Sequence, residues 1–197
     1  MTLKPTKMSK YKARLVVQGC LGRSAYIWGH APAGSVGALM VTLGFVSQDG
    51  WAGCPCDAKS AYLQAEGVNR PLPIRMPGGH PSDPGEVFCA QGSIYGAKDA
   101  GRAWYNHLHA YLEKKGNYES RLERGVSRCV SGGEFRLVPC SHVDDFLLAR
   151  KTVCPVVGDV LGDLPKFLHL EKRDAACEYC GVQFDIGSDT IVLASRP

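Results

Sequence analysis

Residues 141–149 read Ser-His-Val-Asp-Asp-Phe-Leu-Leu-Ala, an apolar run interrupted by two adjacent carboxylates. Burying carboxylates between hydrophobic segments is costly unless a positive group binds them. We predict strands at 135–143 and 146–149, which would place Asp144 and Asp145 at the turn between them. Because aspartate is a common turn residue, an ordinary hairpin turn is an alternative explanation for the pair.

A further acidic residue has a similar setting earlier in the chain. Asp57 ends an apolar stretch that we predict to be a short strand over 51–57. Three carboxylates on adjoining strand ends would suit two Mg²⁺ ions, because Mg²⁺ prefers oxygen ligands and binds substrate phosphates. Two such ions about 4 Å apart activate an attacking oxygen and stabilise a leaving one. The sequence therefore raises the hypothesis that Asp57 meets Asp144 and Asp145 in space.

The remaining pattern mixes helices and strands without a strict βαβ alternation, which predicts an α+β fold. We expect helices over 35–50, with Ser35 as N-cap, over 99–115, and over 153–172 with an interruption at Pro165. Further strands are expected at 11–17, 86–91, 179–186 and 190–194. A hairpin is expected around 131–133, and the Pro- and Gly-rich segment 66–85 is expected to be a loop or an irregular hairpin.

Length and composition are those of an ordinary globular protein. The chain has 197 residues and a net charge of +4, which suits one domain, or one with a small lobe, and permits a polyanionic partner. Residues 1–9 are predicted to be a loose basic tail, and neither a secretory signal nor a membrane span is expected.

The nine cysteines have irregular spacing, which favours reduced thiols in an intracellular protein. Two pairs, Cys54 with Cys56 and Cys177 with Cys180, raise the alternative of a zinc module. We consider this alternative the weakest, because a structural zinc site needs two such pairs close together.

Several blocks resemble the copia-type long-terminal-repeat retrotransposon reverse transcriptase family. Residues 94–105 (IYGAKDAGRAWY) are similar to its most distinctive block. Residues 57–67 (DAKSAYLQAEG) resemble its first catalytic-aspartate motif, and residues 142–145 (HVDD) resemble its Tyr-Val-Asp-Asp box. The supporting blocks are 11–19 (YKARLVVQG), 30–32 (HAP), 50–51 (GW), 179–183 (YCGVQ) and 189–193 (DTIVL). The blocks follow the family order from about residue 10 to residue 194.

The resemblance implies a fingers-and-palm fold in which an antiparallel palm sheet packs on helices. Residues 10–197 would form a partial reverse transcriptase domain without thumb or ribonuclease H parts, as a fragment of a larger polyprotein. It implies an RNA-directed DNA polymerase that uses dNTPs and an RNA or DNA template with a primer. The alternative is a catalytically inactive retrotransposon remnant that at most binds nucleic acid. The expected location is intracellular, in the cytoplasm, a virus-like particle or the nucleus, without a membrane partner.

The resemblance also assigns roles at the metal and nucleotide sites. Asp57, Asp144 and Asp145, with the backbone carbonyl of Ala58, would hold two Mg²⁺ ions, with Mn²⁺ as an alternative. In the same family pattern, Lys12, Arg14, Tyr62 and Gly96 would form the dNTP site. Lys12 and Arg14 would share one face of a strand and grip the triphosphate, Tyr62 would lie under the sugar, and Gly96 would let the backbone approach the nucleotide. The alternatives are a solvated strand face for the two basic residues and a core aromatic for Tyr62.

Nucleic-acid contacts are implied for Lys98, Arg102 and His142. Lys98 and Arg102 would bind template or primer phosphates irrespective of sequence. His142 departs from the family, which usually has tyrosine there, and would alter the floor of the primer site. Gly101 departs from the family's usual proline and would loosen the start of the helix.

Overall fold

The computed structural model describes residues 4–5, 11–12, 14–19, 27, 29–65, 71–82, 85–154, 162–174, 176–179, 181–187 and 190–195. The chain divides into two compact units. One comprises residues 1–30 and 62–104, and the other comprises residues 31–61 and 105–197. The second unit carries all three predicted catalytic aspartates.

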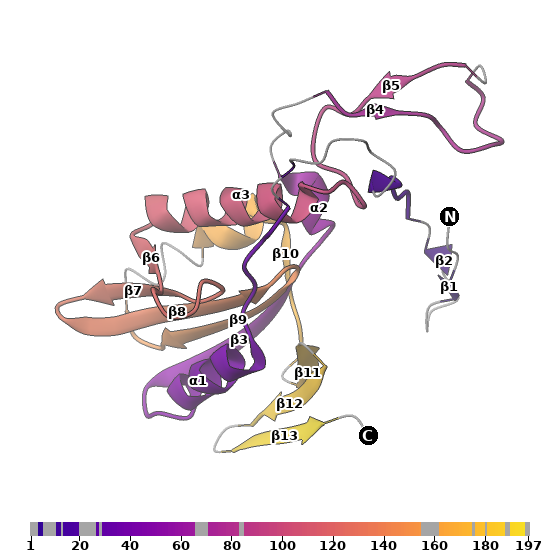
Figure 1. Cartoon of the computed structure of the whole chain (residues 1–197). Coiled ribbons are helices and arrows are strands. Elements are labelled where there is room, and N and C mark those ends of the chain that lie inside the picture. The colour runs from indigo at the N-terminus through magenta and orange to yellow at the C-terminus, as the bar shows by residue number, and fades with distance from the viewer. Residues whose placement is uncertain are drawn as a thin grey trace. The chain divides into compact units, whose positions relative to one another are not determined.

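The second unit is built on a six-stranded antiparallel sheet with the strand order β10-β3-β9-β8-β7-β6 (Figure 1). Its strands are β3 (Trp51–Ala58), β6 (Asn117–Glu119), β7 (Ser127–Ser131), β8 (Glu134–His142), β9 (Asp145–Lys151) and β10 (Leu170–Lys172). The predicted hairpin at 131–133 is confirmed as the β7–β8 turn, where Gly132 and Gly133 both adopt positive φ. Such a backbone favours glycine, because a Cβ atom would clash there.

Helix α1 (Val36–Val46) covers one face of this sheet, as predicted for the helix over 35–50. The Ser35 hydroxyl accepts a hydrogen bond from the Ala38 amide at 3.1 Å and caps the helix. Leu39 and Leu43 on α1 pack with Cys140 and Leu147 from the sheet. Four consecutive residues of β9, 146–149, are buried, as expected for a central strand that is covered on both faces.

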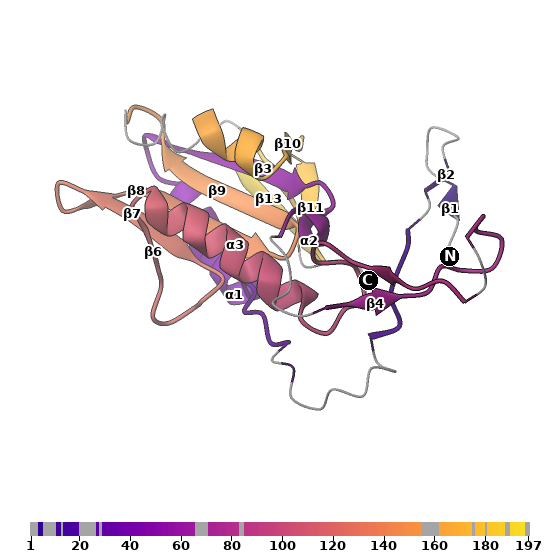
Figure 2. The ribbon, with the colours of Figure 1, turned by 90° about the horizontal axis from the view of Figure 1, so that it is seen from above.

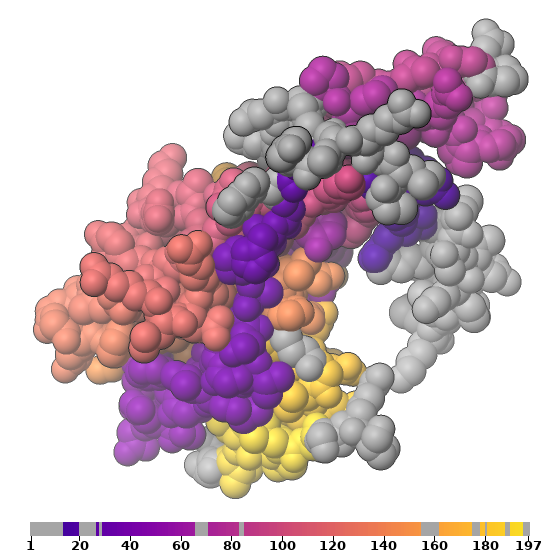
Figure 3. Space-filling model, in the orientation of Figure 1, coloured from indigo at the N-terminus to yellow at the C-terminus, as the bar shows by residue number. Residues whose placement is uncertain are grey.

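A three-stranded antiparallel sheet closes the same core. Its strands are β11 (Ala176–Tyr179), β12 (Val182–Ile186) and β13 (Ile191–Ser195). Tyr179 and Phe184 belong to the buried cluster with α1, and Figure 3 shows α1 and these strands lying against each other. The last segment of the unit therefore belongs to the core.

Leu147 offers a direct test of this core, because its side chain is 0% exposed between β9 and α1. We expect Leu147→Ala to lower the free energy of unfolding by about 2–5 kcal/mol, from lost apolar burial and the cavity left behind. Urea unfolding followed by circular dichroism measures this change. Leu122→Ala is the matched control, since Leu122 is 99% exposed and should lose almost nothing. Equal losses in the two variants would contradict the described core.

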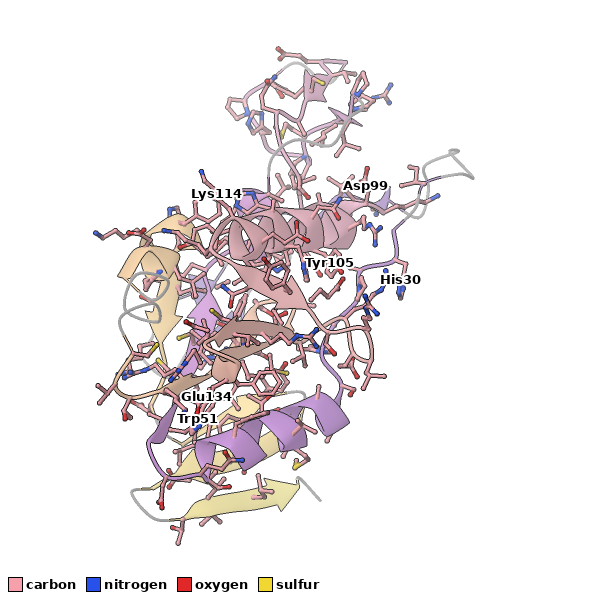
Figure 4. All side chains as sticks on the ribbon, turned by 90° about the vertical axis from the view of Figure 1, so that its left-hand side faces the viewer. His30, Trp51, Asp99, Tyr105, Lys114 and Glu134 are labelled. Carbon is pink, nitrogen blue, oxygen red and sulfur yellow. The ribbon has the colours of Figure 1, made fainter. Side chains whose placement is uncertain are left out.

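The opposite face of the sheet is covered by α3 (Ala100–Lys114) from Tyr105 onward (Figure 2). Figure 4 shows Tyr105 on the side of α3 that faces the strands, and its hydroxyl hydrogen-bonds Glu119 of β6. The ring of Tyr111 stacks on Phe167, with centroids 4.4 Å apart, in a short helix over 162–167. The sheet is therefore the middle layer between α1 and these helices, which confirms the α+β class.

The first unit contains two small antiparallel pairs. They are β1 (Lys4–Pro5) with β2 (Tyr11–Lys12), and β4 (Pro73–Ile74) with β5 (Phe88–Cys89). In the second pair, β4 lies within the Pro- and Gly-rich segment, and β5 lies within the strand expected over 86–91, where it is only two residues long. Helix α2 (Ala61–Gln64) crosses from one unit into the other along the chain, and Leu72, Ala97 and Ala100 form the buried core of the first unit.

Four sequence-based expectations were wrong in detail. The strand expected over 11–17 ends at Lys12, and residues 4–5 of the expected loose tail pair with it. The helix expected over 153–172 is helical at 162–167, with Pro165 inside it, and residues 170–172 form β10; residues 155–161 lie outside the described part. The strand expected over 179–186 is two strands, because a turn at Gly181, with φ of 79°, separates β11 from β12.

In the part of the chain that the structure describes, no helix is long and apolar enough to cross a membrane.

Candidate active site

Two of the predicted catalytic aspartates lie directly opposite each other in the sheet. Asp57 on β3 and Asp145 on β9 are the last pair of an antiparallel register that runs from Trp51 with Lys151. Paired residues of antiparallel strands point to the same face, so the two carboxylates share one side of the sheet. Residues 88 positions apart in the chain are thus brought together by strand pairing, as the sequence predicted.

A guanidinium group sits between these carboxylates. Arg173 Nη2 lies 2.5 Å from Asp57 Oδ1 and 2.7 Å from Asp145 Oδ1. Arg173 directly follows β10, which pairs with β3, and its own amide donates a hydrogen bond to the Pro55 carbonyl at 2.9 Å. Its Nη1 donates a hydrogen bond to the Glu178 carbonyl at 3.1 Å, so both terminal nitrogens of the guanidinium group have acceptors.

The electrostatics of Asp145 reflect a crowded acidic site. Burial raises the pKa of Asp145 above its ordinary value, the Arg173 charge opposes that effect, and the charges of Asp144 and Asp57 raise the pKa further. Carboxylates that lie this close repel one another unless a cation is present. The arrangement therefore calls for positive charge, which Arg173 supplies in this structure.

Asp144 lies in the tight turn between β8 and β9, so the alternative of a hairpin turn also describes its position. Val143, the residue before it, has a φ of 58°. This conformation is strained for a β-branched residue, and such strain is concentrated at functional sites. The Asp144 carbonyl accepts a hydrogen bond from the Ala58 amide at 2.7 Å, which ties the turn to the end of β3.

The oxygen chemistry of the site fits a magnesium ion. Carboxylates are the ligands Mg²⁺ prefers, and Asp57 and Asp145 already converge on one positive group. Among the residues that the structure describes, however, no group of three or more His, Cys, Asp or Glu side chains is placed to hold a metal ion. The guanidinium and a metal ion would therefore compete for the same pair of oxygens.

The predicted nucleotide-binding residues belong to the first unit. Arg14 lies outside any strand and places its guanidinium 4.5 Å from the Tyr95 ring centroid, so the shared strand face expected for Lys12 and Arg14 is wrong. The Lys12 side chain is outside the described part of the structure. The Tyr62 ring packs against Tyr95 and the core of this unit, which favours the core-aromatic alternative for its packing.

Gly96 is required by its surroundings. Its φ is 84°, and a Cβ atom added there would lie 2.0 Å from the Val17 carbonyl oxygen. The Val17 amide in turn donates a hydrogen bond to the Tyr95 carbonyl at 2.8 Å. The glycine thus permits the close approach of another segment of the chain, while a nucleotide contact stays a prediction.

The predicted nucleic-acid residues are spread over both units. In the first unit, Lys98 is exposed, and Arg102 Nη1 donates a hydrogen bond to the His30 carbonyl at 3.3 Å. In the second unit, His142 Nδ1 lies 3.0 Å from the Gly34 carbonyl, and its ring makes an edge contact with Tyr179. His142 therefore has a packing role in this chain, and the nucleic-acid contacts of all three residues stay predictions.

Comparison with known families identifies the chain. A family model described as "Reverse transcriptase (RNA-dependent DNA polymerase)" matches residues 2–196. The chain belongs to the reverse transcriptase family. Its antiparallel sheet with Asp57 and Asp145 at one end is thus the core of a reverse transcriptase domain.

Two curated relatives of this chain come from Arabidopsis thaliana. They are the retrovirus-related Pol polyproteins from transposons RE2 and RE1, each 28% identical over 144 residues, or 72% of this chain. The matched region is 10% of each polyprotein, so the chain spans only a small part of their length. No solved structure matches the chain.

Arg173 is the site residue that sequence reasoning missed. It follows three residues that we expected to be helical, and the charged run 171–174 that contains it matches no motif that we used. The available signal was electrostatic, because a carboxylate pair in an apolar setting requires a positive partner. The sequence nevertheless contains 23 Lys and Arg residues, and the pairing of β10 with β3 selects Arg173 among them.

Proposed function

We propose that this chain is the RNA-directed DNA polymerase core of a copia-type retrotransposon polyprotein and transfers nucleotides with two divalent metal ions. The main support is that Asp57 and Asp145, at the paired ends of β3 and β9, both contact the guanidinium group of Arg173. Asp144, in the adjoining turn, is the third carboxylate of the proposed site. The membership of the chain in the reverse transcriptase family supports this assignment.

In the proposed reaction, the 3′-hydroxyl oxygen of a primer attacks the α-phosphorus of a dNTP. A new phosphorus–oxygen bond forms, the bond to the leaving pyrophosphate breaks, and the hydroxyl proton is released. Bound divalent ions supply activation of the attacking oxygen and charge neutralisation at the leaving oxygens. Asp57, Asp144 and Asp145 would hold these ions, together with the Ala58 carbonyl, and Mn²⁺ could replace Mg²⁺.

The remaining parts of the proposal concern substrates and context. The template would be RNA or DNA with an annealed primer, bound through phosphate contacts from Lys98 and Arg102 and near His142. Arg14 and Lys12 would bind the triphosphate, and Tyr62 and Gly96 would adjoin the dNTP. A fingers-and-palm arrangement, a polyprotein context and a location in the cytoplasm, a virus-like particle or the nucleus belong to the same proposal.

Primer extension tests this proposal. The chain, alone and within a longer Pol polyprotein segment, is incubated with a poly(A) template, an oligo(dT) primer, dTTP and Mg²⁺. We expect extension that requires the divalent ion and stops when it is chelated. Salt-sensitive template–primer binding without incorporation in either form would instead identify a catalytically inactive remnant. The longer segment controls for poor primer retention by the chain alone.

A further inference from the structure

Two thiols lie on one face of β3, the strand that also carries Asp57. Cys54 and Cys56 are two residues apart, so their side chains point to the same side of the sheet. Their sulfur atoms lie 3.7 Å apart, and both cysteines are free thiols. Cys56 is buried and Cys54 is half-buried. The pair therefore forms a compact dithiol that reaches the surface through Cys54.

The dithiol opens onto a cavity of about 460 Å³ within the second unit. This volume lies in the range of small-molecule sites in proteins. Leu148, Leu164 and Leu170 provide apolar walls, Arg150 and Lys172 add positive charge, and Cys154 adds a further thiol to the lining. A ligand with an apolar body and a reactive centre at the sulfur atoms would match these surroundings.

Positive side chains lie beside the two thiols. Arg150 and Lys172 line the same cavity as Cys54 and Cys56. Cationic neighbours favour the thiolate, which is the nucleophilic form of cysteine. A thiol-reactive ligand in the cavity would therefore meet two sulfur atoms in a positive environment.

The number of donors selects the kind of ligand. Among the described residues, no third His, Cys, Asp or Glu side chain joins the pair in a metal-holding group. A sulfur bond to a soft centre is about 2.3 Å long in zinc thiolates, and at the roughly 100° bond angle of a pyramidal trivalent centre two such bonds separate the sulfurs by about 3.5 Å. The observed 3.7 Å separation is close to that distance. A centre that needs only two sulfur ligands and already carries an organic group would be satisfied here.

We propose that Cys54 and Cys56 form a dithiol binding site for a trivalent organoarsenical, whose organic group would occupy the neighbouring cavity. In the reaction, an organoarsenic oxide gains two arsenic–sulfur bonds and loses its arsenic–oxygen bond. The two thiol protons leave with that oxygen as one water molecule, and no atom is oxidised or reduced. The preference follows from softness, because thiolates bind soft centres in preference to hard ones.

Phenylarsine oxide is the probe for this site. The whole chain is treated with the probe and desalted, and its molecular mass is measured by intact-mass spectrometry. We expect an adduct that 2,3-dimercaptopropanol removes and that an equal concentration of monothiol does not. Cys54→Ser and Cys56→Ala should each bind one arsenical fewer than the unsubstituted chain. Cys89→Ser, which changes an exposed single thiol, should bind as much as the unsubstituted chain.

Two further measurements make the outcome decisive. The double variant Cys177→Ser/Cys180→Ser removes the other pair that is closely spaced in the sequence, and it should keep the adduct at Cys54 and Cys56. In the unsubstituted chain, the arsenical should protect the peptide that contains Cys54 and Cys56 from alkylation by iodoacetamide, a readout that needs no variant to fold. The proposal is overturned if that peptide is alkylated in full, if folded Cys54→Ser keeps every adduct, or if the monothiol strips the probe.

Discussion

Asp145→Asn should reduce the rate of primer extension by about 1,000-fold or more, and Asp57→Asn should do the same. Stabilisation of transition-state charge by a bound metal is worth several kcal/mol, and each 1.36 kcal/mol corresponds to a factor of ten in rate. Asparagine keeps the shape of the side chain but removes the negative charge that binds the ion. Because the two carboxylates face each other across β3 and β9, neither can replace the other.

The matched control for this prediction is Asp49→Asn. Asp49 is an exposed aspartate in the turn between α1 and β3, and its change to the amide should leave extension unaltered. Single-turnover incorporation of dTTP, with urea unfolding to verify that each variant is folded, makes the comparison. Full activity in folded Asp145→Asn would remove Asp145 from the site.

Arg173→Leu should produce a protein whose stability depends on Mg²⁺. Without its guanidinium, Asp57 and Asp145 face each other uncompensated, and all three side chains are at most about one-third exposed. Breaking a fully buried ion pair costs about 3–5 kcal/mol, so we expect a smaller loss here, about 1–3 kcal/mol, in a metal-free buffer. Added Mg²⁺ should restore stability, by about 2.7 kcal/mol at a hundred times its dissociation constant.

Thermal unfolding with and without Mg²⁺ measures this effect. Lys151→Leu is the control, because Lys151 also forms an ion pair, with Glu134, at the other end of β9. That variant should gain no more stability from Mg²⁺ than the unsubstituted chain does, because Arg173 still competes with the ion in both. A Mg²⁺ response in Lys151→Leu equal to that of Arg173→Leu, or none in Arg173→Leu, would contradict competition between Arg173 and the metal.

Strong local signals were enough to predict the centre of the fold. The apolar run on both sides of Asp144 and Asp145 gave two paired strands, and the cap at Ser35 marked the start of α1 within one residue. The proximity of Asp57 to Asp145 was a hypothesis based on their similar positions at the ends of apolar segments, and strand pairing confirms it. These features depend on hydrophobic periodicity and on turn chemistry, which are properties of neighbouring residues.

The features that were missed depend on contacts between distant residues. The segment 170–172 has no strong strand pattern, and it becomes β10 because the edge of β3 at Cys56 to Ala58 is available for pairing. Tertiary pairing of this kind overrides local propensity. Arg173 reaches the carboxylates only as a result of that pairing. The packing of Tyr62 and the constraint on Gly96 likewise come from other segments of the first unit.

The pairing of β3 with β10 also has a consequence for how the protein is made. Arg173 lies 116 residues after Asp57, so a ribosome has synthesised most of the chain before the carboxylates meet their counter-ion. Until then one edge of β3 has unpaired amide and carbonyl groups, and such an exposed strand edge can pair with another chain and lead to aggregation. Contacts this distant in sequence also slow folding. Asp57 and Asp145 should therefore form their ion pairs with Arg173 late in folding, after α1 and the β7–β8–β9 meander have formed.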